Sequence, residues 1–170
     1  MKSPSKPYFW IVLYEAEIKG IKVSAENALS HITELVEKLM QHAEETPHGI
    51  IGLCVAIHGL VDQEEIVFTP NYTLQSDLKV QLEDVYPFYV HLENEANLAA
   101  LGEYTFGSSS DSVVSLSIHT GIGAGIVENG KLRTGKTGKA GEIGHSILYP
   151  DGRKCPCGNE GCLEQYASHQ

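Results

Sequence analysis

Residues 139–165 read KAGEIGHSILYPDGRKCPCGNEGCLEQ and contain three of the four cysteines of the chain. His145 lies ten residues before Cys155, and the cysteines follow as C-x-C-x4-C through Cys157 and Cys162. Three thiolates and one imidazole form a common closed ligand set for Zn2+, which prefers four tetrahedral ligands. The pattern therefore predicts a structural zinc site formed by His145, Cys155, Cys157 and Cys162, with no open position for water.

Two other interpretations of the cysteines are weaker. A disulfide would leave one of the three local cysteines unpaired, and the rest of the chain indicates a reducing compartment. Ordinary loop cysteines are the second alternative, but Pro156, Gly158 and Gly161 allow the backbone to curl so that the thiolates converge. The spacing favours the metal site over both.

Two glutamates flank this cluster and call for a separate explanation. Glu142 lies three residues before His145, and Glu164 lies two residues after Cys162. A metal held by these neighbours would bring both carboxylates near one point, where they could accept hydrogen bonds from a small polyol. From this stretch alone, two solvated surface glutamates explain the sequence equally well.

Composition and charge limit the remaining possibilities. The 170 residues suffice for one domain or two small lobes, and 42% hydrophobic residues are typical of a soluble globular protein. A net charge of -10 without a run of Lys and Arg argues against a nucleic-acid-binding surface in this chain. The apolar run over residues 8–14 is too short for a membrane span and makes a poor signal peptide. We therefore expect a cytoplasmic protein with no membrane contact.

Hydrophobic patterns predict strands that alternate with helices, and hence an α/β fold. Strands are expected over 8–14 with continuation to residue 23, 50–57, 64–70, 88–92, 113–118 and 124–128; helices are expected over 24–45, over 76–86 and from residue 94 onward. The apolar run 50–57 indicates a strand covered on both faces, with Cys54 buried in it. Asn129-Gly130 predicts a tight hairpin, and residues 107–112, GSSSDS, are the best candidate for a boundary between lobes.

Several motifs together resemble the ROK family of repressors, open reading frames and kinases. They are VAIHGLVD, FTPNY, LENEANLAALGE, SIHTGIGAGI and the cysteine segment, which occur in the order of the family between residues 50 and 168. The resemblance implies an actin-like (ribonuclease H-like) sugar-kinase fold with sugar bound between two α/β lobes. Residues 1–106 would form an N-terminal lobe without its first phosphate-loop hairpin, and residues 107–170 the start of the second lobe, so the fold would be incomplete.

The resemblance also implies roles for individual residues. Asn71, Asn94, Glu142, His145 and Glu164 match sugar-binding positions, and His145 also matches a zinc ligand together with the three cysteines. Thr120, Gly121 and Gly123 lie in a loop that resembles the one approaching the phosphates of ATP. A glycine-rich turn alone would be weak evidence for a phosphate site, although its backbone N–H groups can surround an anion.

The chain departs from the kinase pattern in three ways. It has no D-x-G-G-T-like segment, its match ends at the cysteine segment, and Glu95 stands where family kinases carry the aspartate that removes a proton from the sugar hydroxyl. One added methylene moves the carboxylate by about an ångström, which can reduce the rate ~10²-fold. The N-E-A-N sequence looks like the xylose-repressor branch. His58 stands where the family commonly has proline, and we assign no chemistry to it.

These features favour a sugar-binding effector part of a ROK-type repressor over an enzyme. Its partners would be a monosaccharide and a second copy of the chain, and DNA only through a helix-turn-helix domain absent from this sequence. The alternative is a fragment or degenerate form of an ATP- and Mg2+-dependent sugar kinase with Glu95 as base. A third possibility is a zinc-stabilised remnant without a ligand. In the preferred interpretation Glu95 joins the sugar-binding residues.

Overall fold

The computed structural model describes residues 12, 14–42, 48–70, 77–107 and 110–169. Its elements are, in chain order, α1 (Ala28–Met40), β1 (Gly52–Ile57), β2 (Leu60–Asp62), β3 (Glu65–Phe68), α2 (Leu78–Val85), β4 (Tyr89–Asn94), α3 (Glu95–Gly102), a π-helical turn (Glu103–Gly107), β5 (Ser112–Ile118), β6 (Ile122–Glu128), β7 (Lys131–Leu132), a 3-10 turn (Ile143–His145) and α4 (Glu164–Ala167). The predicted α/β composition is confirmed.

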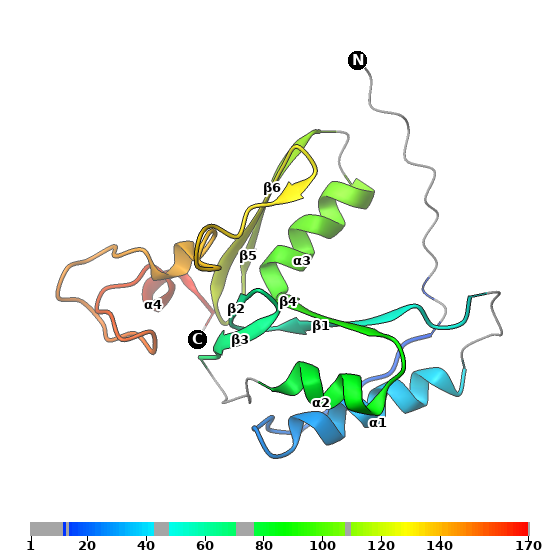
Figure 1. The fold of residues 1–170 in the computed structure, drawn as a ribbon. Helices are drawn as coiled ribbons and strands as arrows, with labels where there is room; N and C mark the ends of the chain where they lie inside the picture. The colour runs from blue at the N-terminus through cyan, green and yellow to red at the C-terminus, as the bar shows by residue number, and fades with distance from the viewer. Residues whose placement is uncertain (1–11, 13, 43–47, 71–76, 108–109, 170) are drawn as a thin grey trace.

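The first layer is built on β1 and β4, which pair in parallel with Gly52 opposite Tyr89. One face of this pair is apolar, and α1 and α2 pack on it side by side (Figure 1). The buried cluster consists of Val36, Ile57, Val61, Ile66, Leu78, Leu82, Tyr86, Val90 and Leu92. Because each large apolar side chain contributes about 1.5–3 kcal/mol on burial, this cluster fastens both helices to the strands.

The opposite face of β1 is open, so the prediction that residues 50–57 are covered on both faces is wrong. Gly52, Cys54 and Ala56 alternate with the core-facing residues of the strand and are exposed. Cys54 is therefore not the buried thiol that its apolar neighbours suggested. The physical reason is that α1 and α2 both pack on the same side of the strand pair.

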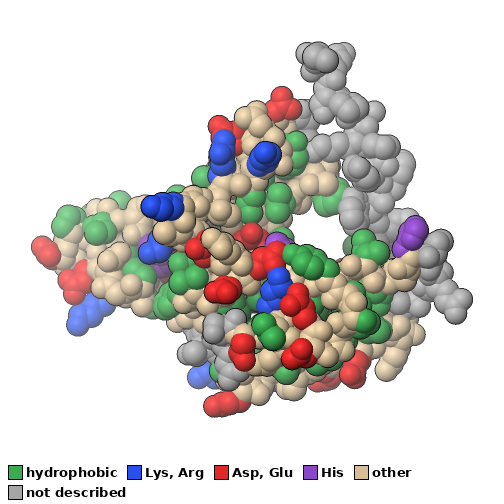
Figure 2. Space-filling model, in the orientation of Figure 1, with side chains coloured by type: hydrophobic (Ala, Val, Ile, Leu, Met, Phe, Trp, Pro, Cys, Tyr) green, Lys and Arg blue, Asp and Glu red, His purple; other side chains and the backbone are tan. Residues whose placement is uncertain are grey.

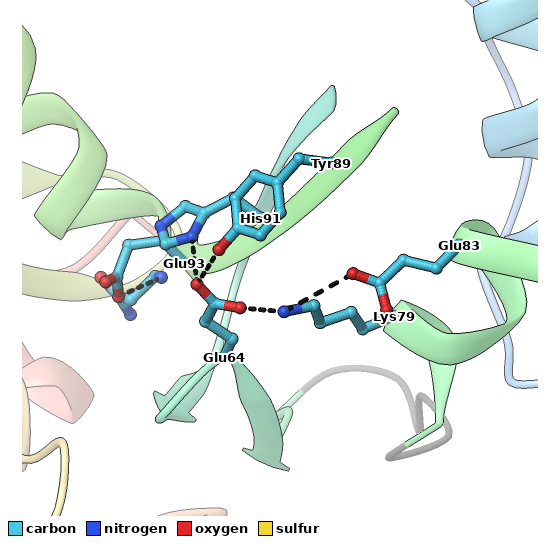
Figure 3. A network of polar contacts seen from close by, with 7 residues as sticks. Glu64, Lys79, Glu83, Tyr89, His91 and Glu93 are labelled. Atoms are coloured by element: carbon cyan, nitrogen blue, oxygen red, sulfur yellow. Dashed lines mark hydrogen bonds and ion pairs between the residues drawn. The ribbon is translucent and has the colours of Figure 1, made fainter. Parts of the chain in front are cut away.

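A polar cluster fastens the β2–β3 hairpin to the first layer. The Glu64 carboxylate accepts hydrogen bonds from Lys79 and the Tyr89 hydroxyl, and His91 Nδ1 lies 2.8 Å from its Oε1 atom (Figure 3). Lys79 also pairs with Glu83 at 3.7 Å. Lys79 and Tyr89 lower the pKa of the Glu64 carboxyl to about 2. We call these five residues the Glu64 cluster.

The second layer is an antiparallel sheet in the order β5–β6–β7, with α3 packed along it (Figure 1). Two glycines of β6 permit this approach: a Cβ at Gly125 would lie 2.1 Å from the Ala96 carbonyl oxygen, and one at Gly123 would lie 3.3 Å from the Ala96 Cβ. Asn129 and Gly130 have positive φ in the β6–β7 turn, as a type I′ hairpin requires. The predicted strands over 113–118 and 124–128 are confirmed as β5 and β6. The predicted hairpin at Asn129-Gly130 is also confirmed, and it joins β6 to β7.

Other element boundaries differ from the predictions by a few residues. The helix expected over 24–45 begins at Ala28, because Ser24 to Asn27 form a turn in which the Asn27 side chain accepts a hydrogen bond from the Ser24 N–H. The elements expected over 64–70, 76–86, 88–92 and from residue 94 appear as β3, α2, β4 and α3.

The strand expected over residues 8–23 is not present in its described part. Residues 12 and 14–23 belong to no strand, while residues 8–11 and 13 lie outside the described residues. A strand needs a neighbour that satisfies its backbone hydrogen-bonding groups, and no described strand pairs with residues 14–23. The strand-like composition of this segment predicted a strand, but it could not show whether a neighbouring strand would pair with it.

Residues 139–169 contain few regular elements and project from the two layers (Figure 1). Isolated bridges between Ile147 and Cys162 and between Lys154 and Glu160 fold this segment back on itself. Gly161 has a φ of +80°, and a Cβ there would lie 1.6 Å from the Tyr149 carbonyl oxygen. This turn therefore requires glycine.

The surface mixes charges of both signs. On the face seen in Figure 2, the Lys and Arg side chains of the described residues are scattered among acidic ones and do not form a continuous patch. Among the described residues, no helix combines the length and the apolar character needed to cross a membrane.

Candidate functional site

A cavity of about 570 Å3 opens between the two layers and the segment that contains the cysteines. Its lining comprises His58, Gly59, Leu60, Val67, Phe68, Pro70, Asn94, Glu95, Ala96, Ser117, His119, Thr120, Gly121, Ile122, Gly123, Lys139, Glu142, His145, Cys157, Asn159 and Glu164. The volume lies within the range of small-molecule sites. Every predicted sugar-binding residue that the structure describes lies on this one cavity.

Asn94 and Glu95 reach the cavity from the junction of β4 and α3. The Asn94 Oδ1 atom accepts hydrogen bonds from the N–H groups of Ala96 and Asn97 at 2.8 and 3.2 Å, so Asn94 caps the helix. Its Nδ2 atom donates to the Gly59 carbonyl at 2.7 Å, and the amide has a second N–H that could reach a ligand. Glu95 is the first helical residue, where the helix dipole favours a carboxylate.

His58 lies beside Glu95, with 3.4 Å between its Nδ1 atom and the Glu95 Oε2 atom. No role was predicted for His58, nor for His119 and Lys139 on the same cavity. His58 directly follows the carboxyl end of β1, and sites of open α/β sheets gather at such strand ends. That position is the sequence signal that could have identified it.

Glu142 lies deeper in the cavity wall. Burial raises the pKa of its carboxyl; His145 acts in the opposite direction, and the Glu164 carboxylate adds to the increase. The Glu142 Oε2 atom lies 3.7 Å from His145 Nε2. The carboxyl group is thus close to the imidazole edge that points away from the cysteines.

Glu164 reaches the cavity from the start of α4. Its Oε2 atom accepts a hydrogen bond of 2.9 Å from the Ile122 N–H at the start of β6. A Cβ at Gly121 would lie 3.0 Å from the same oxygen, so a larger residue in this turn would press against the carboxylate. The contact connects the cysteine segment to the second layer.

The four predicted metal ligands converge, with their ligand atoms all within 4.8 Å of one another. Cys155 Sγ lies 3.5 Å from His145 Nδ1, and Cys157 Sγ lies 3.7 Å from Cys162 Sγ. A tetrahedral ion with Zn–S bonds of about 2.3 Å and a Zn–N bond of about 2.0–2.1 Å requires ligand separations of roughly 3.6–3.8 Å. The two separations given above are close to this range, so the four residues could hold one metal ion.

The three cysteines of the cluster are free to act as ligands. The three cysteines are not joined by disulfides. Burial raises the pKa of the Cys155 thiol, and burial together with the neighbouring thiols raises the pKa of Cys162 to about 12. A bound cation would stabilise the thiolates, and the carboxylate of Glu142 beside Nε2 of His145 resembles the outer partner that metal-bound histidines commonly have.

The glycine-rich turn between β5 and β6 contributes Thr120, Gly121 and Gly123 to the cavity. The His119 N–H donates to the Gly121 carbonyl at 2.9 Å, which closes the turn on itself. Gly123 has a separate reason to be glycine, because α3 packs against it. The role of these residues in phosphate binding stays a prediction. Asn71 lies outside the described residues, although its neighbour Pro70 lines the cavity.

Comparison with known proteins identifies the family. The model described as "ROK family" matches residues 12–170. The xylose repressor of Bacillus subtilis (strain 168) is 39% identical over 143 residues, which are 82% of this chain and 37% of the repressor. A glucokinase of Streptomyces coelicolor is 40% identical over 126 residues, which are 71% of this chain and 40% of the glucokinase.

A solved structure agrees with these matches. The ROK family glucokinase from Streptomyces griseus, crystallised with glucose and AMPPNP, superimposes with a TM-score of 0.76 at 36% identity, covering 85% of this chain and 46% of the glucokinase. The chain thus spans about two fifths of the length of its relatives. Because the family model covers nearly the whole sequence and the fold agrees, the chain belongs to the ROK family.

Proposed function

We propose that this chain is the sugar-binding effector part of a ROK-type transcriptional repressor of the xylose-repressor kind. The observation that carries the proposal is the convergence of three carboxylates, from Glu95, Glu142 and Glu164, on one cavity large enough to hold a small molecule. Carboxylates are strong acceptors for hydroxyl donors, and a monosaccharide offers several hydroxyls close together. The likeness to the xylose repressor supports the regulatory role.

In this proposal each side chain has a defined part in binding. Glu142 and Glu164 accept sugar hydroxyls from one wall of the cavity, and Asn94 and Glu95 bind from the opposite wall. His145 presents its Nε2 edge to the sugar and its Nδ1 atom to the metal cluster. Asn71 would add a further amide next to Pro70.

The nature of Glu95 favours a sensor over a kinase. The resemblance places this carboxylate where family kinases have a shorter aspartate, and a general base must lie within hydrogen-bond reach of its proton. Glu95 is instead 58% exposed and lies beside His58. A sensor needs only binding that differs between two conformations, since such binding shifts the population between them.

We assign Zn2+ to the cluster of His145 and the three cysteines. It would supply structural cross-linking that fixes the wall carrying Glu142 and Glu164. Residues 1–106 and 107–170 would be parts of two lobes that meet at the cavity, in an actin-like arrangement. Support comes from the convergence of the four ligand atoms within 4.8 Å of one another and from the position of the cavity between the two layers.

The partners proposed for the whole protein follow from the same role. A helix-turn-helix domain outside these 170 residues would bind the operator, because the net charge of -10 gives this part little attraction for DNA. Dimerisation would match such a protein to a two-fold operator. We expect it to act in the cytoplasm, where a repressor meets its operator and the free cysteines stay reduced.

A sugar kinase is the second candidate, favoured by the similarity to glucokinases. Glu95 would then accept the proton of the sugar hydroxyl, and Thr120, Gly121 and Gly123 would lie near the phosphates of Mg-ATP. The third candidate is a remnant of the family fold that is stabilised by the proposed metal but binds no sugar.

Calorimetric titration of zinc-replete protein separates the three candidates. The panel would include xylose, glucose, N-acetylglucosamine and N-acetylmannosamine, each with and without Mg-ATP. Saturable sugar binding with an affinity that does not depend on ATP supports the sensor and identifies its ligand. Binding that becomes tighter with ATP, together with heat released by turnover, supports the kinase. If no sugar of the panel binds, the result supports the third candidate, a remnant without a ligand.

A further inference from the structure

From the contacts of His58 we infer that this residue is a positioning residue of the proposed sugar site, which directs the Glu95 carboxylate and contributes a second binding atom. The inference rests on the proposed function, since it assigns a new residue to the same cavity. It concerns a histidine for which the sequence offered no role.

His58 connects three separate segments of the chain at the cavity. It follows β1, its Nδ1 atom lies 3.4 Å from the Glu95 Oε2 atom at the start of α3, and its ring borders the β5–β6 turn. A Cβ at Gly121 would lie 3.4 Å from His58 Cε1 and 3.6 Å from His58 Nε2. The imidazole therefore lies between α3 and the glycine-rich turn.

The side chain remains accessible to a ligand in this position. His58 is 35% exposed and lines the cavity, as Glu95 does. By contrast, the carboxylate paired with His91 in the Glu64 cluster also has Lys79 and Tyr89 as partners.

The orientation of the ring defines what each atom can do. A hydrogen bond from Nδ1 to Glu95 Oε2 would leave Oε1 of the same carboxylate to accept a hydrogen bond from a ligand. With Nδ1 carrying the proton, neutral His58 has an acceptor at Nε2, on the side of Gly121 and the Glu164 carboxylate. One sugar hydroxyl could donate to Glu95 and a neighbouring one to His58, so the pair would recognise vicinal hydroxyls.

Three substitutions separate the two ring atoms. His58→Ala removes both, His58→Asn keeps a nitrogen near the Nδ1 position, and His58→Gln keeps one near the Nε2 position. His48→Ala is the matched control, because His48 is exposed and outside the cavity. Calorimetry would use the sugar that binds most tightly to the unchanged chain, and zinc content and thermal stability would be measured for every variant.

We expect His58→Ala to weaken sugar binding about tenfold, the size of one lost hydrogen bond to a charged group. His58→Asn should recover most of this affinity, because the amide can still direct Glu95, while His58→Gln should recover less. Zinc content should not change. Equal affinities for Ala and the unchanged chain, or equal rescue by Asn and Gln, would overturn the positioning role.

A measurement without sugar keeps this test separate from the proposed function. Long-range proton–nitrogen NMR spectra, recorded at a pH where the imidazole carries one proton, should show that proton on Nδ1 of His58, and Glu95→Ala should change that tautomer preference. An Nε2-protonated His58 contradicts the inference even if sugar binds. Failure of every sugar to bind, with the Nδ1 tautomer present, overturns the proposed function and leaves the His58–Glu95 pair as a structural contact only.

Discussion

Two clusters of carboxylates and imidazoles, one around Glu64 and one at the cavity, differ in how their charges are satisfied. In the Glu64 cluster one carboxylate contacts Lys79, Tyr89 and His91 (Figure 3). In the cavity, Glu142 has an imidazole at 3.7 Å and Glu95 has one at 3.4 Å. The same residue types therefore form a cluster whose carboxylate has several hydrogen-bond partners from the protein around Glu64. At the cavity they form a cluster whose carboxylates have fewer such partners.

The difference shows how to separate structural from ligand-directed polar groups. A carboxylate with several protein donors contributes to folding, because its charged form is stabilised only in the folded chain. A carboxylate with few donors beside a cavity keeps acceptor capacity for a ligand. Substitutions in the two clusters should consequently affect different measurements.

Removal of the proposed metal should have the largest effect and should act on the cavity alone. Chelation, or Cys162→Ser, should disorder residues 143–163 and abolish sugar binding, since structural zinc sites contribute on the order of 10 kcal/mol to the parts that they organise. Metal analysis and backbone NMR spectra would measure both effects. Cys54→Ser is the control, because Cys54 is exposed on the open face of β1. Equal metal loss in both variants would contradict the assigned ligands.

Glu64→Gln should have the next largest effect, this time on folding. We expect the free energy of unfolding to fall by about 2 kcal/mol, because Lys79 loses its charged partner at a site that is only partly exposed. Urea denaturation would measure the loss, with the exposed neighbour Glu65→Gln as control. Sugar affinity should stay unchanged, and a loss of affinity would show that the clusters are coupled.

Glu142→Gln should produce the opposite pattern. Sugar affinity should fall about tenfold as a charged acceptor becomes a neutral one. The free energy of unfolding should remain the same or rise slightly, because burial already raises the pKa of this carboxyl. Calorimetry and urea denaturation on the same zinc-replete sample would compare the two. Unchanged affinity would exclude Glu142 from the site.

The smallest expected effect is the pH dependence of the Glu64 contribution. The pKa of Glu64 is lowered from 4.5 to about 2 in the folded chain, so its stabilisation is fully present above pH 4.5 and is lost as the pH falls toward 2. The stability difference between the unchanged chain and Glu64→Gln should therefore shrink by about 1 kcal/mol between pH 5.5 and pH 3. Urea midpoints at both values measure it, and a constant difference would contradict the lowered pKa. Acid release of the proposed metal should affect both proteins alike and cancel in the comparison.

Local patterns predicted the parts of the molecule whose interactions are close in sequence. The spacing of His145 and the three cysteines sufficed, because short loops can bring such ligands together. The β6–β7 hairpin followed from Asn129-Gly130, whose backbone preferences select the turn. The boundaries of α1 and the absent strand over residues 14–23 were less accessible, because side-chain contacts in a turn and a pairing partner decide them.

The sequence by itself determined the family, the alternation of strands and helices, and the clustering of His145 with the three cysteines, since each depends on residue type and short spacing. Only the tertiary structure decided that α1 and α2 share one face and leave Cys54 exposed, that Glu64 meets Lys79 and His91, and that His58 lies against Glu95. His58 and Glu95 are 37 residues apart, so only the packing of β1, β4 and α3 brings them together. Contacts between distant residues depend on that packing, and no local pattern encodes it.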